Sequence, residues 1–133
     1  MKLVVDFSYA KNYNQIGCIN MENISLHNIN LDHNLNKAVD IIVNTIDPDK
    51  IILFGSKARG DDNNDSDYDL LILKNGIKDK RQIVNKIYRN LLGLHIAVDI
   101  ILENYKDYLK NKDNKFLIYK TIEREGRTVY ERE

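Results

Sequence analysis

The chain has 133 residues, the length of one domain that can bury a proper hydrophobic core. Lys plus Arg and Asp plus Glu both total 20, so the excess of positive charge typical of general nucleic-acid-binding proteins is missing. Cys18 has no second cysteine for an internal disulfide, and no charged-then-apolar leader opens the chain. No apolar run approaches the roughly 20 residues of a membrane span. We therefore expect a cytoplasmic protein without a membrane partner.

The first third of the chain has the weakest periodicity. Residues 2–8 are compatible with a short strand, and a loose alternation of apolar and polar residues over 16–31 is compatible with an added hairpin. We therefore expect an N-terminal extension over residues 1–33 and one principal domain over residues 34–133.

A helix is expected from Asn34 onward, because apolar residues recur there at spacings of four, three and four: Leu35, Val39, Ile42 and Ile46. Asp47 should end this helix, since a residue before proline is driven out of the helical region. Two short apolar runs follow, over residues 50–54 and 68–74, and each reads as a buried strand.

The second half begins with a helix predicted over residues 79–93. Ile83, Ile87 and Leu91 would form its buried stripe, and Gly93 would stop it. Residues 95–102 read as a third strand, apolar on both faces apart from Asp99, a pattern typical of a central strand.

A last helix is expected over residues 114–125, ended by Gly126, and an edge strand over residues 127–130. Together with the preceding elements, this order predicts an α/β (α+β) domain in which helices pack on a small mixed β-sheet.

The segment between the first two strands is strongly acidic, with aspartates at positions 61, 62, 65, 67 and 69. An EF-hand loop would need Gly and Glu where Ser66 and Ile72 stand, and a P-loop would need Lys and Ser or Thr where Asp61 and Asp62 stand. Both motifs are excluded. A solvated acidic turn without function is the remaining alternative if these aspartates act alone.

The spacing of the carboxylates favours a metal site. Asp67 and Asp69 would project to one face of a strand, and Asp99 would join them from the strand alongside. Carboxylates that share a site either raise a pKa or bind a cation, and together with phosphate oxygens they suit Mg²⁺. The alternative for Asp99 is a local capping role at a strand end.

The start of the same segment has the features of a phosphate site. Gly55 and Ser56 leave a strand and open a short helical segment, so backbone N–H groups and the Ser56 hydroxyl would face outward at the positive end of a helix dipole. Lys57 and Arg59 are close enough to neutralise anionic oxygens, although either could equally be a solvated surface charge. A phosphate site beside metal-binding carboxylates indicates phosphoryl or nucleotidyl transfer.

These residues resemble a known family. The stretch GSKARGDDNNDSDYDL resembles the Gly-Ser, Ala-Arg-Gly, Ser-Asp-x-Asp-Leu pattern of the minimal nucleotidyltransferases in the DNA polymerase β-like superfamily, and the closing EREGRTVYE resembles the ends of these proteins. Asp99 stands where the third carboxylate of that family would follow. Asp62 departs from the pattern, which usually has a small residue there, and residues 1–33 lie outside it.

The resemblance implies ATP as substrate and two Mg²⁺ ions. Asp67 and Asp69 would bridge the two ions, and Asp99 would ligate the second and help deprotonate the acceptor hydroxyl. The nucleotide site would contain the following residues, of which the first two hold the β and γ phosphates: Gly55, Ser56, Lys57, Arg59 and Ser66.

The resemblance also implies an acceptor. Small members of the family resemble antitoxins that transfer AMP to a tyrosine of a HEPN-type ribonuclease toxin, which is the leading prediction. Two alternatives stay open: a stand-alone enzyme that modifies a small molecule in a pocket formed across a homodimer, and a non-catalytic module that neutralises its toxin by contact. The three histidines are expected to lie outside the site: His27, His33 and His95.

Overall fold

The computed structural model describes residues 32–63, 65–114 and 117–133. The expected strand at 2–8 and hairpin at 16–31 lie outside these ranges. Along the described chain the helices are α2 (His33–Ile46), α3 (Ser56–Arg59), α4 (Lys80–Leu91), the 3₁₀ helix η2 (Leu92–Leu94), α5 (Tyr105–Asn111) and α6 (Ile118–Glu125). The strands are β1 (Lys50–Phe54), β2 (Tyr68–Leu73), β3 (Val98–Glu103) and β4 (Arg127–Glu131). No helix in these ranges is long and apolar enough to cross a membrane.

The four strands form one sheet in the order β3-β2-β1-β4. β1 is antiparallel to both β2 and β4, whereas β2 and β3 are parallel, so the sheet is mixed. The predicted fold class is thereby confirmed. The parallel register pairs Asp69 with Asp99, which brings together two of the carboxylates singled out in the sequence.

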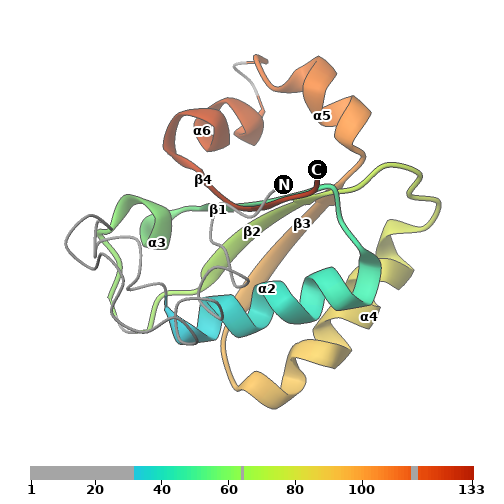
Figure 1. The fold of residues 1–133 in the computed structure, drawn as a ribbon. Helices are drawn as coiled ribbons and strands as arrows, with labels where there is room; N and C mark the ends of the chain where they lie inside the picture. Colours follow the sequence, from blue (N-terminus) through green and yellow to red (C-terminus); the bar gives the residue numbers. More distant parts are fainter. Residues whose placement is uncertain (1–31, 64, 115–116) are drawn as a thin grey trace, which may run out of the picture.

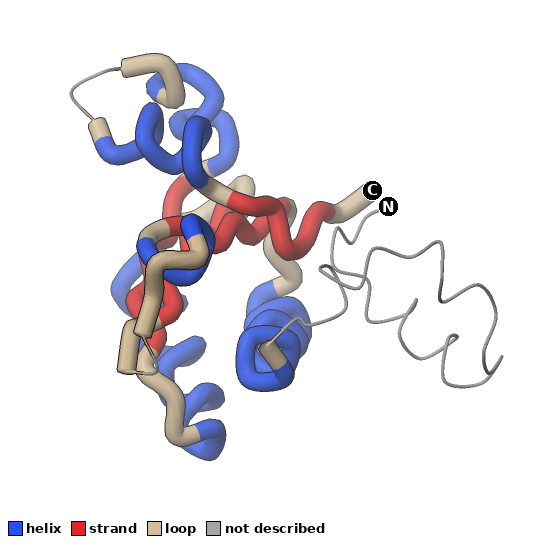
Figure 2. The backbone as a smooth tube through the Cα atoms, turned by 90° about the vertical axis from the view of Figure 1, so that its left-hand side faces the viewer, coloured by secondary structure: helices blue, strands red, loops and turns tan. Residues whose placement is uncertain are grey.

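The sheet lies between two layers of helices (Figure 1). Helices α2 and α4 cover one face and α5 and α6 the other, as the view in Figure 2 also shows. Because successive side chains of a strand point to opposite faces, Leu70 and Ile72 of β2 belong to the core under α2 and α4. Leu71 and Leu73 belong to a second, smaller core that includes Tyr108 of α5 and Ile122 of α6.

Helix α2 follows the predicted apolar stripe. Its buried residues are Leu35, Ala38, Val39 and Ile42. The helix begins after Asp32, whose side chain accepts a hydrogen bond from the backbone N–H of Asn34 at 3.1 Å. It ends at Asp47, which adopts a left-handed conformation (φ 49°) directly before Pro48. Both predicted ends of the helix are confirmed to within one residue.

Gly93 does not stop α4, contrary to the prediction. The chain continues from Leu91 into η2, and His95 takes the left-handed conformation (φ 53°) that ends this turn. Since β3 starts only at Val98, His95 is not part of the strand that carries Asp99.

The prediction that the third strand is central is wrong, because β3 lies at an edge of the sheet that the described strands form. Its apolar character on both faces has another cause: Val98 and Leu102 pack in the larger core, and Ile101 packs against the smaller one. Its outer edge is partly occupied, since the Ile100 N–H donates to the Tyr88 hydroxyl at 3.1 Å.

The C-terminal third contains one more helix than the sequence predicted. The predicted helix at 114–125 is shorter and corresponds to α6, and α5 precedes it as a separate helix. Tyr108 is the buried residue of α5, so this helix has no apolar stripe that periodicity could reveal. Gly126 ends α6, and β4 is an edge strand, as predicted.

Candidate active site

The site lies where β1 leads into α3. Gly55 joins the two elements in a conformation (φ 73°) that favours glycine. A Cβ atom at this position would overlap with the Oδ2 atom of Asp69 and would lie 3.1 Å from its Cγ atom. The carboxylate of Asp69 therefore packs against the backbone of the predicted phosphate loop, and only glycine leaves room for it.

Helix α3 has the features that the phosphate prediction requires. Gly55 is its N-cap and no side chain caps the N-terminus, while the Gly55 carbonyl accepts the N–H groups of Ala58 and Arg59, both at 3.1 Å. Gly60 (φ 82°) ends the helix after four residues, none of them buried. Uncapped N–H groups at a helix N-terminus favour an anion, so this turn suits a phosphate group.

The three predicted carboxylates occupy neighbouring positions. Asp69 is paired in register with Asp99, so both belong to the face of the sheet that α5 and α6 cover. Asp67 lies just before β2, which begins at Tyr68, and is close enough for its charge to act on Asp69. Asp69 is partly buried, whereas Asp67 and Asp99 are exposed. Partial burial raises the pKa of Asp69, and the negative charges of Asp99 and Asp67 raise it further, against a smaller opposing effect of Arg59.

These residues fit the Mg²⁺ that the resemblance implies. The negative charges of Asp99 and Asp67 raise the pKa of Asp69, and a hard cation would relieve this repulsion. Carboxylate oxygens are suitable ligands for Mg²⁺ when phosphate oxygens complete the shell. Within the described residues, no group of three or more His, Cys, Asp or Glu side chains is gathered in an arrangement that could hold a metal ion. The fit therefore rests on the chemistry of the donors.

The two cationic residues of the motif lie in different surroundings. The Lys57 ammonium lies 4.5 Å from the ring centroid of Tyr68 and 3.2 Å from Oδ2 of Asp62. Tyr68 belongs to the opposite face of β2 from Asp69, so the structure does not bring Lys57 to the carboxylates. Arg59, in contrast, acts electrostatically on Asp69. Asp62, the departure from the family pattern, is thereby placed beside Lys57.

Ser66 has a local structural role. Its hydroxyl accepts the N–H of Asn63 at 3.0 Å and donates to the Asn63 side chain at 3.2 Å, and its own N–H bonds the Asn63 carbonyl at 3.0 Å. These bonds tie the acidic loop together just before Asp67. Tyr68, one residue further on, donates its hydroxyl hydrogen to Asp32 and so links the start of β2 to the N-cap of α2.

Glu125 was not predicted as a site residue. It lies at the end of α6, and its Oε2 atom is 3.2 Å from Nη1 of Arg59. The sequence offered a weak signal for it, because Glu125 belongs to the closing EREGRTVYE segment that resembles the family.

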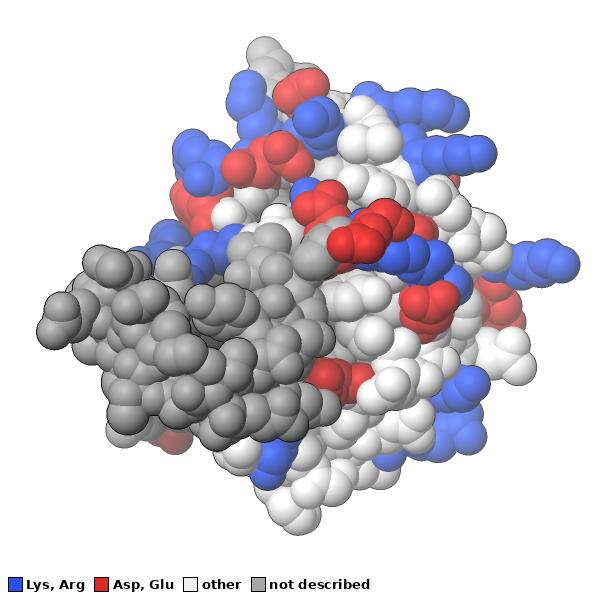
Figure 3. Space-filling view, in the orientation of Figure 1, with Lys and Arg blue, Asp and Glu red and all other residues white. Residues whose placement is uncertain are grey.

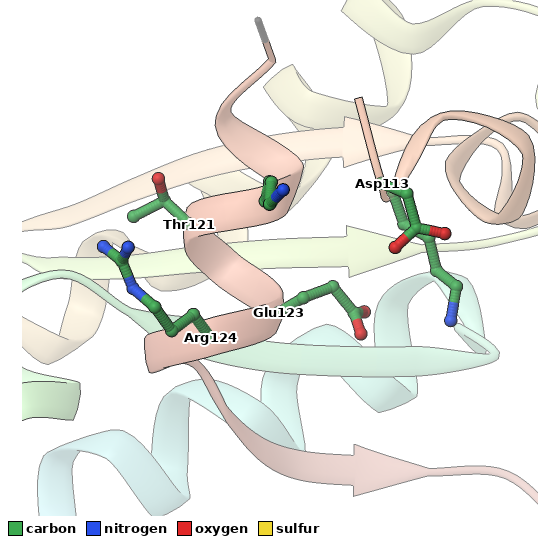
Figure 4. A pocket seen from close by; sticks show the side chains of 6 residues that line it. Asp113, Thr121, Glu123 and Arg124 are labelled. Carbon is green, nitrogen blue, oxygen red and sulfur yellow. The ribbon is translucent and has the colours of Figure 1, made fainter. Parts of the chain in front are cut away.

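A groove of about 460 Å³ lies on the α5 and α6 side of the molecule (Figure 4). Its lining residues are Lys112, Asp113, Lys120, Thr121, Glu123 and Arg124. The residues predicted for the site do not line it, so this groove is separate from the carboxylates. On the face shown in Figure 3, Lys and Arg side chains are interspersed with Asp and Glu, and neither sign forms a continuous field. This mixture agrees with the balanced net charge.

A family model described as "Polymerase beta, Nucleotidyltransferase" matches residues 36–133. The chain belongs to this nucleotidyltransferase family. The matched segment contains the predicted phosphate loop and the three predicted carboxylates. The chain is an enzyme of the nucleotidyltransferase class, of the minimal type that the motif predicted.

One relative is a protein of Methanocaldococcus jannaschii named "Putative protein adenylyltransferase MJ0604". It is 36% identical over 81 residues, an alignment that covers 61% of this chain and 77% of that protein. Among solved structures, one described as "Crystal structure of the toxin-antitoxin with AMP-PNP" is similar in fold, with a TM-score of 0.56 and 18% identity over 74% of this chain and 73% of the other.

Proposed function

We propose that this nucleotidyltransferase transfers AMP from ATP to a hydroxyl group of a partner protein, and that the partner is a HEPN-type ribonuclease toxin which the chain silences as its antitoxin. The observation that carries the nucleotide half of the proposal is the packing of the Asp69 carboxylate against Gly55, with Asp99 in register beside it. This contact supports a single site that would comprise the predicted phosphate loop and the carboxylates.

The acceptor half is supported by two comparisons. The Methanocaldococcus relative is named as a protein adenylyltransferase, and the structural neighbour was described as a toxin-antitoxin with an ATP analogue. Asp67 and Asp99 are exposed, which leaves this edge of the site accessible to a hydroxyl group on another protein. We place the reaction in the cytoplasm, where ATP and a ribonuclease toxin meet.

Each residue has a defined task in this proposal. Mg²⁺ held by Asp67, Asp69 and Asp99 would neutralise charge on the triphosphate and on the leaving pyrophosphate. The N-terminal N–H groups of α3 and the Ser56 hydroxyl would bind the β and γ phosphates. The carboxylate of Asp99 would accept the proton of the acceptor hydroxyl, whose oxygen forms a bond to the α phosphorus while the bond to pyrophosphate breaks.

The test is to incubate the protein with ATP, Mg²⁺ and the product of the neighbouring gene, and to record intact masses. The proposal expects the neighbour to gain one or more AMP units. Asp99→Asn should abolish the gain. The matched control is Asp113→Asn, which removes an exposed carboxylate from the separate groove and should leave the gain unchanged.

Other results would replace the acceptor half of the proposal. A neighbour that stays unmodified but is inhibited at stoichiometric ratio would identify a binding module that acts by contact. The absence of a complex, together with nucleotidylation of a small hydroxylated compound, would identify a stand-alone enzyme.

A further inference from the structure

Arg59 is held from two sides by residues that are far apart in the sequence. Its Nε atom donates to Oδ2 of Asp61 at 3.1 Å, and its Nη1 atom donates to Oε2 of Glu125 at 3.2 Å. The guanidinium group is planar and rigid, so two bonds at different edges fix its orientation. Within the described part of the chain, the Nη2 atom donates to no residue, so its N–H groups are free there to bind a ligand.

Arg59 depends on such contacts because its own helix provides little support. Helix α3 has four residues and no buried side chain, and Asp61 belongs to the same exposed loop. An ion pair between two exposed neighbours contributes little, since each long side chain must be ordered at an entropic cost. Among the residues that the structure describes, Glu125 is thus the contact that ties Arg59 to another part of the fold.

Glu125 itself stands on a well-packed support. It lies three residues after Ile122, which is 1% exposed, and directly before Gly126. The N–H of Gly126 donates to the Ile122 carbonyl at 2.7 Å. A Cβ atom on Gly126 would lie 2.7 Å from Cγ2 of Ile52, so the end of α6 packs closely on β1. Arg124 and Arg59 both hold the pKa of Glu125 below its ordinary value, Arg124 more strongly, and the carboxylate therefore stays ionised at neutral pH.

The position of Arg59 relates this contact to the nucleotide. Arg59 is the last residue of α3, the four-residue helix whose N-cap Gly55 packs against the carboxylate of Asp69. Arg59 also lies one turn after Ser56, where the phosphate groups are expected to bind. A guanidinium group with free N–H groups at this place can bind the oxygens of a triphosphate.

We propose that Glu125 is a positioning residue for nucleotide binding: it holds Arg59 in the orientation in which the free N–H groups meet the triphosphate, and helix α6 is therefore part of the ATP site. This inference rests on ATP as the substrate of the proposed function, and it is independent of the acceptor. Binding of a nucleotide analogue therefore tests it even if the acceptor is not a protein.

The experiment measures the affinity for AMP-PNP with Mg²⁺ by titration calorimetry. We expect Glu125→Ala to weaken binding by about 5- to 20-fold, because Arg59 loses its fixed orientation, and Arg59→Ala to weaken it at least as much. In the Arg59→Ala background, Glu125→Ala should have no further effect. Glu125→Gln keeps an oxygen that can accept from Arg59 and should retain most of the affinity.

The matched control is Glu123→Ala, which removes the same charge from the same helix. Glu123 accepts the hydroxyl hydrogen of Tyr108 and does not contact Arg59, so AMP-PNP affinity should not change. Thermal melting checks that every variant is folded. The Nε–Hε signal of Arg59 in a nitrogen–proton spectrum should shift in Glu125→Ala and stay in place in Glu123→Ala.

Three results would overturn the proposal. Unchanged affinity in Glu125→Ala would show that Asp61 suffices to position Arg59. Equal weakening in the presence and absence of Arg59 would show that Glu125 acts by another route. Tighter binding in Glu125→Ala would show that Glu125 competes with the triphosphate for Arg59.

Discussion

On the face of the sheet that packs against α2 and α4, β2 contributes Tyr68, Leu70 and Ile72, which are 6%, 0% and 0% exposed. On the opposite face the same strand contributes Asp69, Leu71 and Leu73. The first face is a continuous hydrophobic core, whereas the second changes from a core to a carboxylate site within two residues of one strand.

This difference shows how a small domain can separate stability from chemistry. The larger core anchors the strand, so the polar end of the other face can carry carboxylates that repel one another. The neighbouring residues Asp69 and Leu70 should therefore respond to substitution in different ways: activity should be lost at Asp69 and stability at Leu70.

The largest expected effect is at Asp69. Asp69→Asn should reduce nucleotidyl transfer by at least about 1,000-fold, because the substitution removes a charge on which binding and chemistry both depend. Burial and like charges raise the pKa of Asp69 in the folded protein. At pH values above the ordinary pKa of an aspartate, the ionised side chain therefore destabilises the folded state relative to the unfolded state. The melting temperature of the variant at pH 7 should therefore be equal or higher. A loss of activity with unfolding would contradict the separation of the two faces.

Leu70→Ala should have the opposite signature. Leu70 is fully buried in the larger core, and its truncation should lower the free energy of unfolding by about 2–5 kcal/mol. Urea denaturation measures this loss. Because Leu70 points away from Asp69, the protein that stays folded should bind ATP as the wild type does. Weaker ATP binding by the folded protein would show that the two faces of β2 are not independent.

Gly55→Ala should moderately reduce both the stability of the fold and the binding of ATP. The new Cβ atom would overlap with the Asp69 carboxylate. The alanine would also be held at an unfavourable positive φ, which costs roughly 1–3 kcal/mol. We expect a lower melting temperature together with weaker Mg²⁺-dependent ATP binding. Gly76→Ala is a suitable control, since Gly76 also has a positive φ (75°) but nothing within 4 Å of its Cβ position, and it should lose stability alone.

The smallest effect is expected at Lys57. Lys57→Met keeps the aliphatic stem but removes the ammonium charge that lies over the Tyr68 ring, which should cost about 0.5–1 kcal/mol of stability. Its effect on ATP affinity should be smaller than that of Arg59→Met, because only Arg59 lies on the side of the carboxylates. Calorimetric titration of both variants makes the comparison, and equal losses would show that Lys57 reorients to the nucleotide.

Much of the fold was predictable because its elements have local signals. The stripe of α2 and the apolar runs of β1 and β2 follow from periodicity, and Gly126 ends α6 as predicted. Two features depended on tertiary context. The edge position of β3 depends on the order of the strands, which the apolar character of its sequence does not reveal. Helix α5 buries Tyr108 alone, so its sequence has no periodic apolar pattern.

Parts of the site were predictable for a different reason. Asp69 and Asp99 are paired in register, as their places in two apolar runs suggested, and the short α3 follows Gly55 as predicted. Asp67 was expected to lie in the same strand as Asp69, but β2 begins one residue after it, at Tyr68. The surroundings of Lys57 and Arg59 could not be told apart from the sequence. Both side chains are long and flexible, and their spacing does not show which one lies near Tyr68 and which near Asp69. Glu125 approaches Arg59 from 66 residues away, a separation at which no local pattern indicates a contact.

The most direct test of the account is the ATP affinity of the wild type and of Asp69→Asn, each measured by titration calorimetry with Mg²⁺ and with excess chelator. If the phosphate loop and the carboxylates form one metal-dependent site, the wild type binds ATP more tightly with Mg²⁺, and Asp69→Asn loses that difference while remaining folded. An equal gain from Mg²⁺ in both proteins would contradict the account.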